Sequence, residues 1–307
     1  MLIGMTRIRL HDTSPEFSPI AFGTWRLLED PLSATPEALL KLLKTSVEHG
    51  ITTIDTAEIY GGYLVEKLLG TALALDTGVS NRVEIITKAG IYVPTAFHPE
   101  RRFAHYNGSA ARLVKSAEKS LRWLGVEALD CFLVHRPDWT ASIDDTAAGL
   151  NQLLKDGKIR SAGVSNYSAS QFRALNSRMD QPLVTNQVEF HPFHMDPIYD
   201  GVFDQCQEMR VRPMAWSPMA GGRIFAEGDA DAERLREACA RMADRYGSAS
   251  VDQLVLAWIM AHPARPMPVL GTAKETRIKA AAAATEVVLT REDWYGLWEA
   301  AKGYRIP

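Results

Sequence analysis

Residues 39–55 read LLKLLKTSVEHGITTID, and the apolar residues in this stretch change their period halfway along. Leu43 and Val47 stand four apart, on one face of a predicted helix, whereas residues 51–54 form a short run that is typical of a buried strand. Gly50 lies between them, and glycine often ends a helix in the left-handed conformation. A helix that passes at once into a strand predicts repeated βα units with parallel strands.

The same alternation recurs along the whole chain. Gly125 and Gly157 also end predicted helices just before a strand, and no G-x-G-x-x-G spacing is present that would favour an open dinucleotide-binding sheet. Eight βα units in about the length usual for such barrels predict a single (β/α)₈ TIM barrel over residues 1–307, with a short N-terminal hairpin before it. The predicted strands are Ile20–Phe22, Ile51–Ile54, Val83–Ile86, Leu129–Val134, Ile159–Val164, Leu183–Val188, Arg212–Trp216 and Met267–Leu270.

Composition excludes several classes of protein. A net charge of -3 and a pI near 6.3 provide no basic surface for nucleic acid. No apolar run reaches the ~18 to 20 residues of a membrane-spanning helix, and no signal peptide is recognisable. Three widely separated cysteines favour a reducing compartment, so we expect a cytoplasmic protein that acts on a small molecule. The residues leave the oligomeric state undetermined.

Polar residues close most of the predicted strands. In a (β/α)₈ barrel the carboxyl ends of the strands form one mouth, where active sites lie. We therefore expect these side chains to converge: Asp55, Lys88, His135, Ser165, Asn166, Gln187, Glu189, Gly271 and Thr272.

Tyr60 decides between two interpretations of Asp55 and Lys88. The two charges alone are equally well explained as a structural ion pair between neighbouring strands or as part of a site. Tyr60 follows Asp55 by five residues, and we expect the nearby ammonium group to lower the pKa of the phenol so that it acts as a general acid. His135 is either an ordinary core histidine or a neutral imidazole that orients a substrate oxygen.

The segment after the last strand predicts a phosphate site. Thr272, Lys274 and Arg277 lie where a loop opens a helix, and helix N-termini with nearby cations suit a 2′-phosphate. Two solvated surface cations are the alternative. The stretch Ser217-Pro218-Met219-Ala220-Gly221-Gly222-Arg223 is small and bendable enough to cover a pyrophosphate.

These motifs together resemble the aldo-keto reductase family, especially a bacterial branch that ends in a Gly-Tyr-x-x-Pro tail. The resemblance rests on Phe22-Gly23-Thr24-Trp25, on Asp55-Thr56-Ala57-Glu58-Ile59-Tyr60-Gly61, and on Lys88, His135, Gly163-Val164-Ser165-Asn166 and Asn186-Gln187. It implies reduction of carbonyl compounds with NADP(H), with Asp55, Tyr60, Lys88 and His135 as the catalytic four. It also implies a cofactor site formed by Gly23, Thr24, Trp25, Asp55, Ser165, Asn166, Gln187, Trp216, Ser217, Pro218, Met219, Gly221, Arg223, Gly271, Thr272, Lys274 and Arg277.

Two other functions compete with a reductase. Some barrels of this family serve as cofactor-sensing regulatory subunits with little turnover. A metal hydrolase would use His191, His194 and Asp196, but Pro192 and the absence of helical spacing favour a loop.

Within the reductase interpretation, we expect the substrate to be selected by residues 91–107, with its aromatics Tyr92, Phe97, Phe103 and Tyr106, and by Trp25 and Trp139. The pair Arg101-Arg102 is expected to face solvent, and the pocket to accept bulky apolar or aromatic carbonyl compounds.

Overall fold

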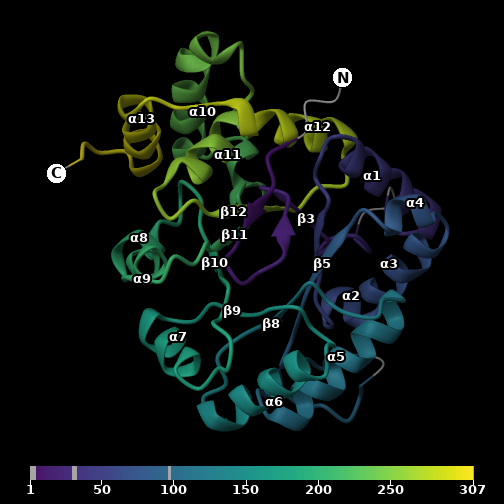
Figure 1. Ribbon diagram of the computed structural model, residues 1–307. Coiled ribbons are helices and arrows are strands. Elements are labelled where there is room, and N and C mark those ends of the chain that lie inside the picture. Colours follow the sequence, from purple (N-terminus) through teal and green to yellow (C-terminus); the bar gives the residue numbers. More distant parts are fainter. Residues whose placement is uncertain (1–4, 30–32, 96–97, 307) are drawn as a thin grey trace.

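Eight parallel strands close into a barrel in the computed structural model, which describes residues 5–29, 33–95 and 98–306 (Figure 1). The predicted barrel is confirmed, and every predicted run overlaps one of its strands. The strand order around the barrel is β10-β11-β12-β3-β4-β5-β8-β9. The strands are β3 (Ala21–Gly23), β4 (Thr53–Asp55), β5 (Glu84–Ala89), β8 (Cys131–Val134), β9 (Ala162–Ser165), β10 (Asn186–Glu189), β11 (Met214–Trp216) and β12 (Met267–Leu270).

Helices surround the strands, as Figure 1 shows, and most of them bury an apolar face in the core. The predicted glycine helix ends are confirmed: Gly125 takes a φ of 70° after α5, and Gly50 takes a φ of 81° before β4. The main helices are α1 (Pro36–Glu48), α3 (Val65–Ala74), α5 (Ala110–Leu124), α6 (Ile143–Lys155), α7 (Ala169–Asn176), α9 (Val202–Glu208), α10 (Ala230–Met242), α11 (Val251–Ala261), α12 (Glu275–Ala283) and α13 (Arg291–Lys302). Shorter turns of helix are α2 (Tyr60–Tyr63), α4 (Thr77–Ser80) and α8 (Asp196–Tyr199).

The barrel closes where β12 pairs with β3, although these strands are far apart in sequence (Figure 1). Gly23 makes this approach possible. A Cβ atom added there would lie 2.2 Å from the carbonyl oxygen of Leu270, which is far inside contact distance. Gly23 therefore fixes how tightly the first and last strands meet at the mouth.

The predicted N-terminal hairpin covers the opposite end of the barrel. Strands β1 (Ile8–Arg9) and β2 (Glu16–Phe17) pair antiparallel. Leu10 and Phe17 are fully buried in the same cluster as Met214 and Met267, which belong to barrel strands. Apolar packing thus seals the amino-terminal end, and the carboxyl end is left for polar side chains.

Among the described residues, no helix has the length and apolar character needed to cross a membrane.

Candidate active site

Asp55, Lys88 and Tyr60 meet at the mouth of the barrel, as the sequence predicts. The Lys88 ammonium donates to Asp55 Oδ1 at 2.7 Å and lies 3.1 Å from the Tyr60 hydroxyl. Lys88 is fully buried and Asp55 almost so. The strand register brings them together, because Asp55 ends β4 and Lys88 lies on the neighbouring β5.

The turn that carries Tyr60 is tied to β5. The amide of Thr56 donates to the carbonyl of Ile86, and the amide of Glu58 donates to the carbonyl of Lys88. The Glu58 carboxylate is itself buried and accepts from Arg112 at 2.7 Å. Backbone bonds and a buried ion pair therefore hold the phenol in place before any ligand arrives.

The ionisation of Tyr60 differs from the prediction. Burial raises the pKa of the Tyr60 phenol, and the opposing effect of the Lys88 ammonium is smaller, so the expected fall in the pKa is wrong. Burial would lower the pKa of Lys88, but Asp55 and Tyr60 reverse this and the net pKa is raised. Tyr60 is therefore a neutral phenol beside a charged lysine at neutral pH.

His135 directly follows β8 and is also buried at this mouth. Burial, helped by the charges of Lys88 and Arg136, lowers the pKa of the imidazole well below its ordinary value. Its ring lies 5.9 Å from that of Tyr60, and its Nδ1 has no hydrogen-bond partner among the described residues. His135 is therefore a neutral imidazole at the mouth, which fits either of the two interpretations of this residue.

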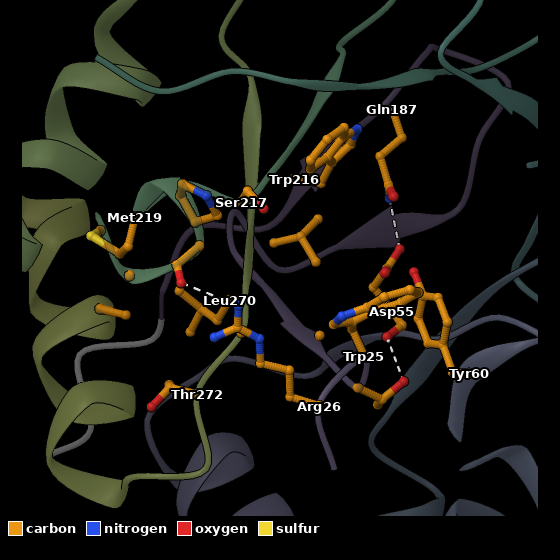
Figure 2. Close-up of a pocket in the computed structure, with 18 of the residues that line it drawn as sticks. Trp25, Arg26, Asp55, Tyr60, Gln187, Trp216, Ser217, Met219, Leu270 and Thr272 are labelled. Atoms are coloured by element: carbon orange, nitrogen blue, oxygen red, sulfur yellow. Dashed lines mark hydrogen bonds between the residues drawn. The ribbon is translucent and has the colours of Figure 1, made fainter. Parts of the chain in front are cut away.

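A cavity of about 420 Å³ opens above these groups (Figure 2). Trp25, Asp55 and Tyr60 lie together on one side of it, and Thr272 lies across from them. The predicted residues that line this cavity are Gly23, Thr24, Trp25, Asp55, Tyr60, His135, Ser165, Gln187, Trp216, Ser217, Pro218, Met219, Gly221, Gly271, Thr272 and Arg277.

An amide and an indole form the wall beside the buried charges. The Gln187 side chain donates to Asp55 Oδ2 at 2.7 Å (Figure 2), and Ser165 Oγ donates to the carbonyl of Gln187. Trp216 donates its indole N–H to Asn166 at 3.0 Å. Asn166 also donates to Ser165 and does not line the cavity, so here it orients its neighbours.

The loop after β11 follows the prediction in part. Ser217, with a φ of 54°, and Gly221, with a φ of 66°, turn the chain along the cavity. Left-handed backbone at a non-glycine residue is uncommon and concentrates at functional sites. Arg223 does not lie with them: its guanidinium pairs with Asp229 and Asp231, outside the cavity.

A second cavity of about 320 Å³ adjoins the first at the start of α12. Lys274 and Arg277 line it, together with Gly271 and Thr272, and the amide of Lys274 donates to Thr272 Oγ1. Arg277 reaches both cavities and stacks over the ring of Phe225. Positive charge therefore gathers at the end far from Tyr60.

Sequence reasoning missed several residues of the two cavities. Arg26 lines both and donates to the carbonyl of Gly221 at 3.1 Å, and Arg136 lines the first beside His135. Both arginines directly follow residues predicted for the site, Trp25 and His135, and this adjacency in the sequence could have identified them. The other missed residues of the first cavity are Asp252, Leu256, Val269 and Leu270.

The expected substrate loop lies elsewhere. Tyr92 and Tyr106 belong to a small hairpin of β6 (Ile91–Tyr92) and β7 (His105–Tyr106), and none of the described residues of 91–107 lines either cavity. Phe97 lies outside the described residues. Trp139 is 78% exposed and also does not line either cavity, whereas Trp25 lines the first.

The expectation for the Arg101-Arg102 pair holds only for Arg102. Arg101 donates to the Tyr63 hydroxyl at 2.7 Å and stacks over the ring of Tyr92. Tyr92 and Phe103 of this loop thus contact cations of their own chain, and neither ring lines the cavity at the mouth.

The histidines after β10 serve the local turn. His191 places Nε2 3.1 Å from Glu189 and accepts the amide of Phe193 on Nδ1, so both ring nitrogens have partners. His194 and His191 exchange backbone hydrogen bonds. Within residues 5–29, 33–95 and 98–306, no group of three or more suitable side chains is placed to hold a metal ion.

Comparison with known proteins agrees with this site. The model of the aldo/keto reductase family matches residues 19–301. A Bacillus subtilis (strain 168) protein named "Uncharacterized oxidoreductase YcsN" is 40% identical over 303 residues, covering 99% of this chain and all of the relative. A 6-dehydroglucose reductase of Agrobacterium fabrum is 38% identical over 302 residues, covering 98% and 100% of the two chains.

A solved structure supports the same conclusion. An aldo-keto reductase from Klebsiella pneumoniae in complex with NADPH superposes with a TM-score of 0.77 at 27% identity, covering 99% of this chain and 97% of that one. The barrel with buried Asp, Lys and Tyr at its mouth and the matches over nearly the whole chain thus lead to the same family. The protein belongs to the aldo/keto reductase family.

Proposed function

We propose that the protein reduces aldehydes or ketones to alcohols with NADPH, using Tyr60 as the proton donor. One observation carries this proposal: the Tyr60 hydroxyl lies 3.1 Å from a buried lysine, under a cavity large enough for a ligand. The Agrobacterium relative, whose name specifies a reductase, supports the direction. Three free, buried cysteines, Cys131, Cys206 and Cys239, support a cytoplasmic location.

The two cavities fit a phosphorylated dinucleotide. They share Gly23, Arg26 and Arg277, and together they extend from an aromatic end at Trp216 to a cationic end at Lys274. Ser165 and Gln187 offer polar groups near the first end, and Thr272 offers a hydroxyl near the second. NADPH, when bound there, supplies the hydride that the carbonyl carbon receives.

The residues at the mouth divide the remaining work. Tyr60 is protonated at neutral pH and donates its proton to the carbonyl oxygen, and the Lys88 ammonium stabilises the phenolate that this transfer leaves. Asp55 keeps Lys88 charged and in position. His135, which is neutral and lines the cavity, binds the substrate oxygen and orients it toward Tyr60.

The test is turnover by the purified protein. A panel of aldehydes and ketones is mixed with NADPH, and cofactor oxidation is followed by absorbance and product formation by chromatography. We expect alcohol formation with several members of the panel. Binding of NADPH without turnover of any carbonyl compound would contradict the proposal and favour a cofactor-sensing role.

A further inference from the structure

Arg136 is a guanidinium beside the proposed catalytic groups. It follows His135 directly and lines the first cavity. Its charge acts on both groups: together with burial and Lys88 it lowers the pKa of His135, and it opposes in small part the rise that burial causes in the pKa of Tyr60. Arg136 therefore lies at the end of the cavity where a substrate would react, far from the cations of α12.

No partner within the described residues neutralises Arg136. None of the hydrogen bonds or ion pairs among residues 5–29, 33–95 and 98–306 involves its side chain. The nearby Asp138 is directed elsewhere, because its carboxylate accepts the amide of Gly108 at 2.8 Å and the amide and hydroxyl of Thr140. Asp55 is already bound by Lys88 and Gln187.

The other arginines at the cavities differ from Arg136 in this respect. Arg26 donates to the carbonyl of Gly221, and Arg277 lies 3.7 Å from Asp252 and stacks over Phe225. A guanidinium group stays charged at every physiological pH and carries five N–H donors that seek oxygen acceptors. An arginine left without such acceptors in a cavity wall is available to a ligand.

Trp25 lines the same cavity and presents an apolar plane. Its ring packs edge-on against Tyr60 at 4.9 Å between centroids and remains 52% exposed. The ring of Trp25 can pack against the apolar C–H groups of a ligand, and the free guanidinium of Arg136 can donate to its oxygen atoms. A molecule that has both kinds of group therefore fits this part of the cavity. A purely apolar ligand would leave the donors of Arg136 unpaired.

Building on the proposed function, we infer that Arg136 selects carbonyl substrates that carry an oxygen-acceptor group, either a hydroxyl or a carboxylate, close to the carbonyl carbon. This differs from the substrate class predicted from the sequence, which was bulky apolar or aromatic carbonyl compounds. Trp25 contributes contact area, and Arg136 contributes the choice between polar and apolar substrates.

The experiment compares three aldehydes of similar length with the NADPH-loaded enzyme: glyceraldehyde, succinic semialdehyde and butanal. In the native protein we expect kcat/KM for at least one oxygenated aldehyde to exceed that for butanal by about tenfold or more. Arg136→Met should lower that value about tenfold or more, mainly through KM, and should leave butanal within about twofold. The aldehyde that loses more identifies the hydroxyl or the carboxylate as the recognised group.

Arg102→Met is the matched control, since it removes the same charge from an exposed side chain outside both cavities. It should change none of the three values. Equal effects of Arg136→Met on all three aldehydes, or no effect on any, would overturn the inference and leave the reductase proposal intact.

A binding measurement separates the two proposals. The affinities of the corresponding products, glycerol, 4-hydroxybutyrate and butanol, are measured on the NADP⁺-loaded protein by calorimetry. If no aldehyde is turned over but Arg136→Met still weakens an oxygenated alcohol selectively, the reductase proposal fails and the role of Arg136 stands. If no product binds in an Arg136-dependent way, the inference fails.

Discussion

The two ends of the barrel are formed by the same eight strands but differ in what they bury. At the amino-terminal end, Leu10 and Phe17 pack in an apolar cluster with barrel residues. At the carboxyl end, Asp55 and Lys88 are equally buried, yet they bear charges, and Asp55 lines a cavity. Burial of apolar surface stabilises a fold, whereas a buried ion pair contributes little net stability. The amino-terminal end of the barrel therefore stabilises the fold, and the carboxyl end holds the groups that can perform chemistry.

The largest effect should come from Tyr60→Phe at the carboxyl end. Loss of the proton donor should lower kcat for carbonyl reduction by about 100- to 10,000-fold, with little change in the dissociation constant for NADPH. Steady-state kinetics and fluorescence titration measure the two quantities. Tyr63→Phe is the matched control, because its hydroxyl contacts Ile91 and Arg101 outside the cavity. Native kcat in Tyr60→Phe would rule out this tyrosine as the donor.

Phe17→Ala tests the other end. Removing a fully buried ring should lower the free energy of unfolding by about 3–5 kcal/mol, because it leaves a cavity in the apolar cluster at the amino-terminal end of the barrel. Urea denaturation measures this change. Turnover by the fraction that stays folded should match that of the native protein. Phe103→Ala, at a ring that is 72% exposed, should change stability by less than about 0.5 kcal/mol. A large fall in kcat for Phe17→Ala would show that the two ends are coupled.

Glu66 provides a smaller test, on the outer side of β5. Its buried carboxyl group accepts from Thr87 and Ser120, and burial raises its pKa to about 7. The folded state therefore binds a proton that the unfolded state loses, so this stabilisation is present below the unfolded pKa and is lost as pH rises through the folded one.

Glu66→Gln should remove that dependence. Between about pH 4.5 and 7, the native protein should lose on the order of 2–3 kcal/mol of stability from this group, and the variant should not. Denaturation at several pH values measures this. Glu118→Gln, at a partly exposed carboxylate on the same helix as Ser120, serves as the control. Parallel pH profiles for native protein and Glu66→Gln would contradict the prediction.

The smallest effect should appear at the cationic end of the cavities. Arg277→Ala should weaken binding of NADPH by about tenfold and binding of NADH much less, because only NADPH carries a 2′-phosphate. Fluorescence titrations with both cofactors measure the difference. Lys279→Ala removes an exposed charge from the same helix and should leave both affinities unchanged. Equal weakening of NADPH and NADH by Arg277→Ala would remove the argument for a phosphate site.

Several parts of the candidate site were accessible from the sequence because strands place side chains in a regular way. Asp55 and Lys88 end or lie on adjacent parallel strands, so their meeting follows from the register. The predicted strands were displaced by up to about three residues. Ile159, for example, begins a predicted run, but β9 begins at Ala162, since apolar burial extends beyond the ladder hydrogen bonds.

Loops resisted prediction because their paths depend on distant partners. Arg223 was expected beside the cavity, but Asp229 and Asp231 bind it elsewhere. Tyr92 was expected in a pocket wall, but Arg101 and Arg112 stack on it. Arg136 was not singled out, because its lack of a partner is a property of the folded surroundings.

The sequence by itself determined the barrel, its hairpin, the family and the residues that converge at the mouth. Periodicity and strand ends encode these features locally. Only the tertiary structure decided the ionisation of Tyr60, because desolvation and the charge of Lys88 act in opposite directions and their balance depends on how deeply the phenol is buried. It also decided which arginines remain free for a ligand, since a side chain's partners come from segments far away in the chain.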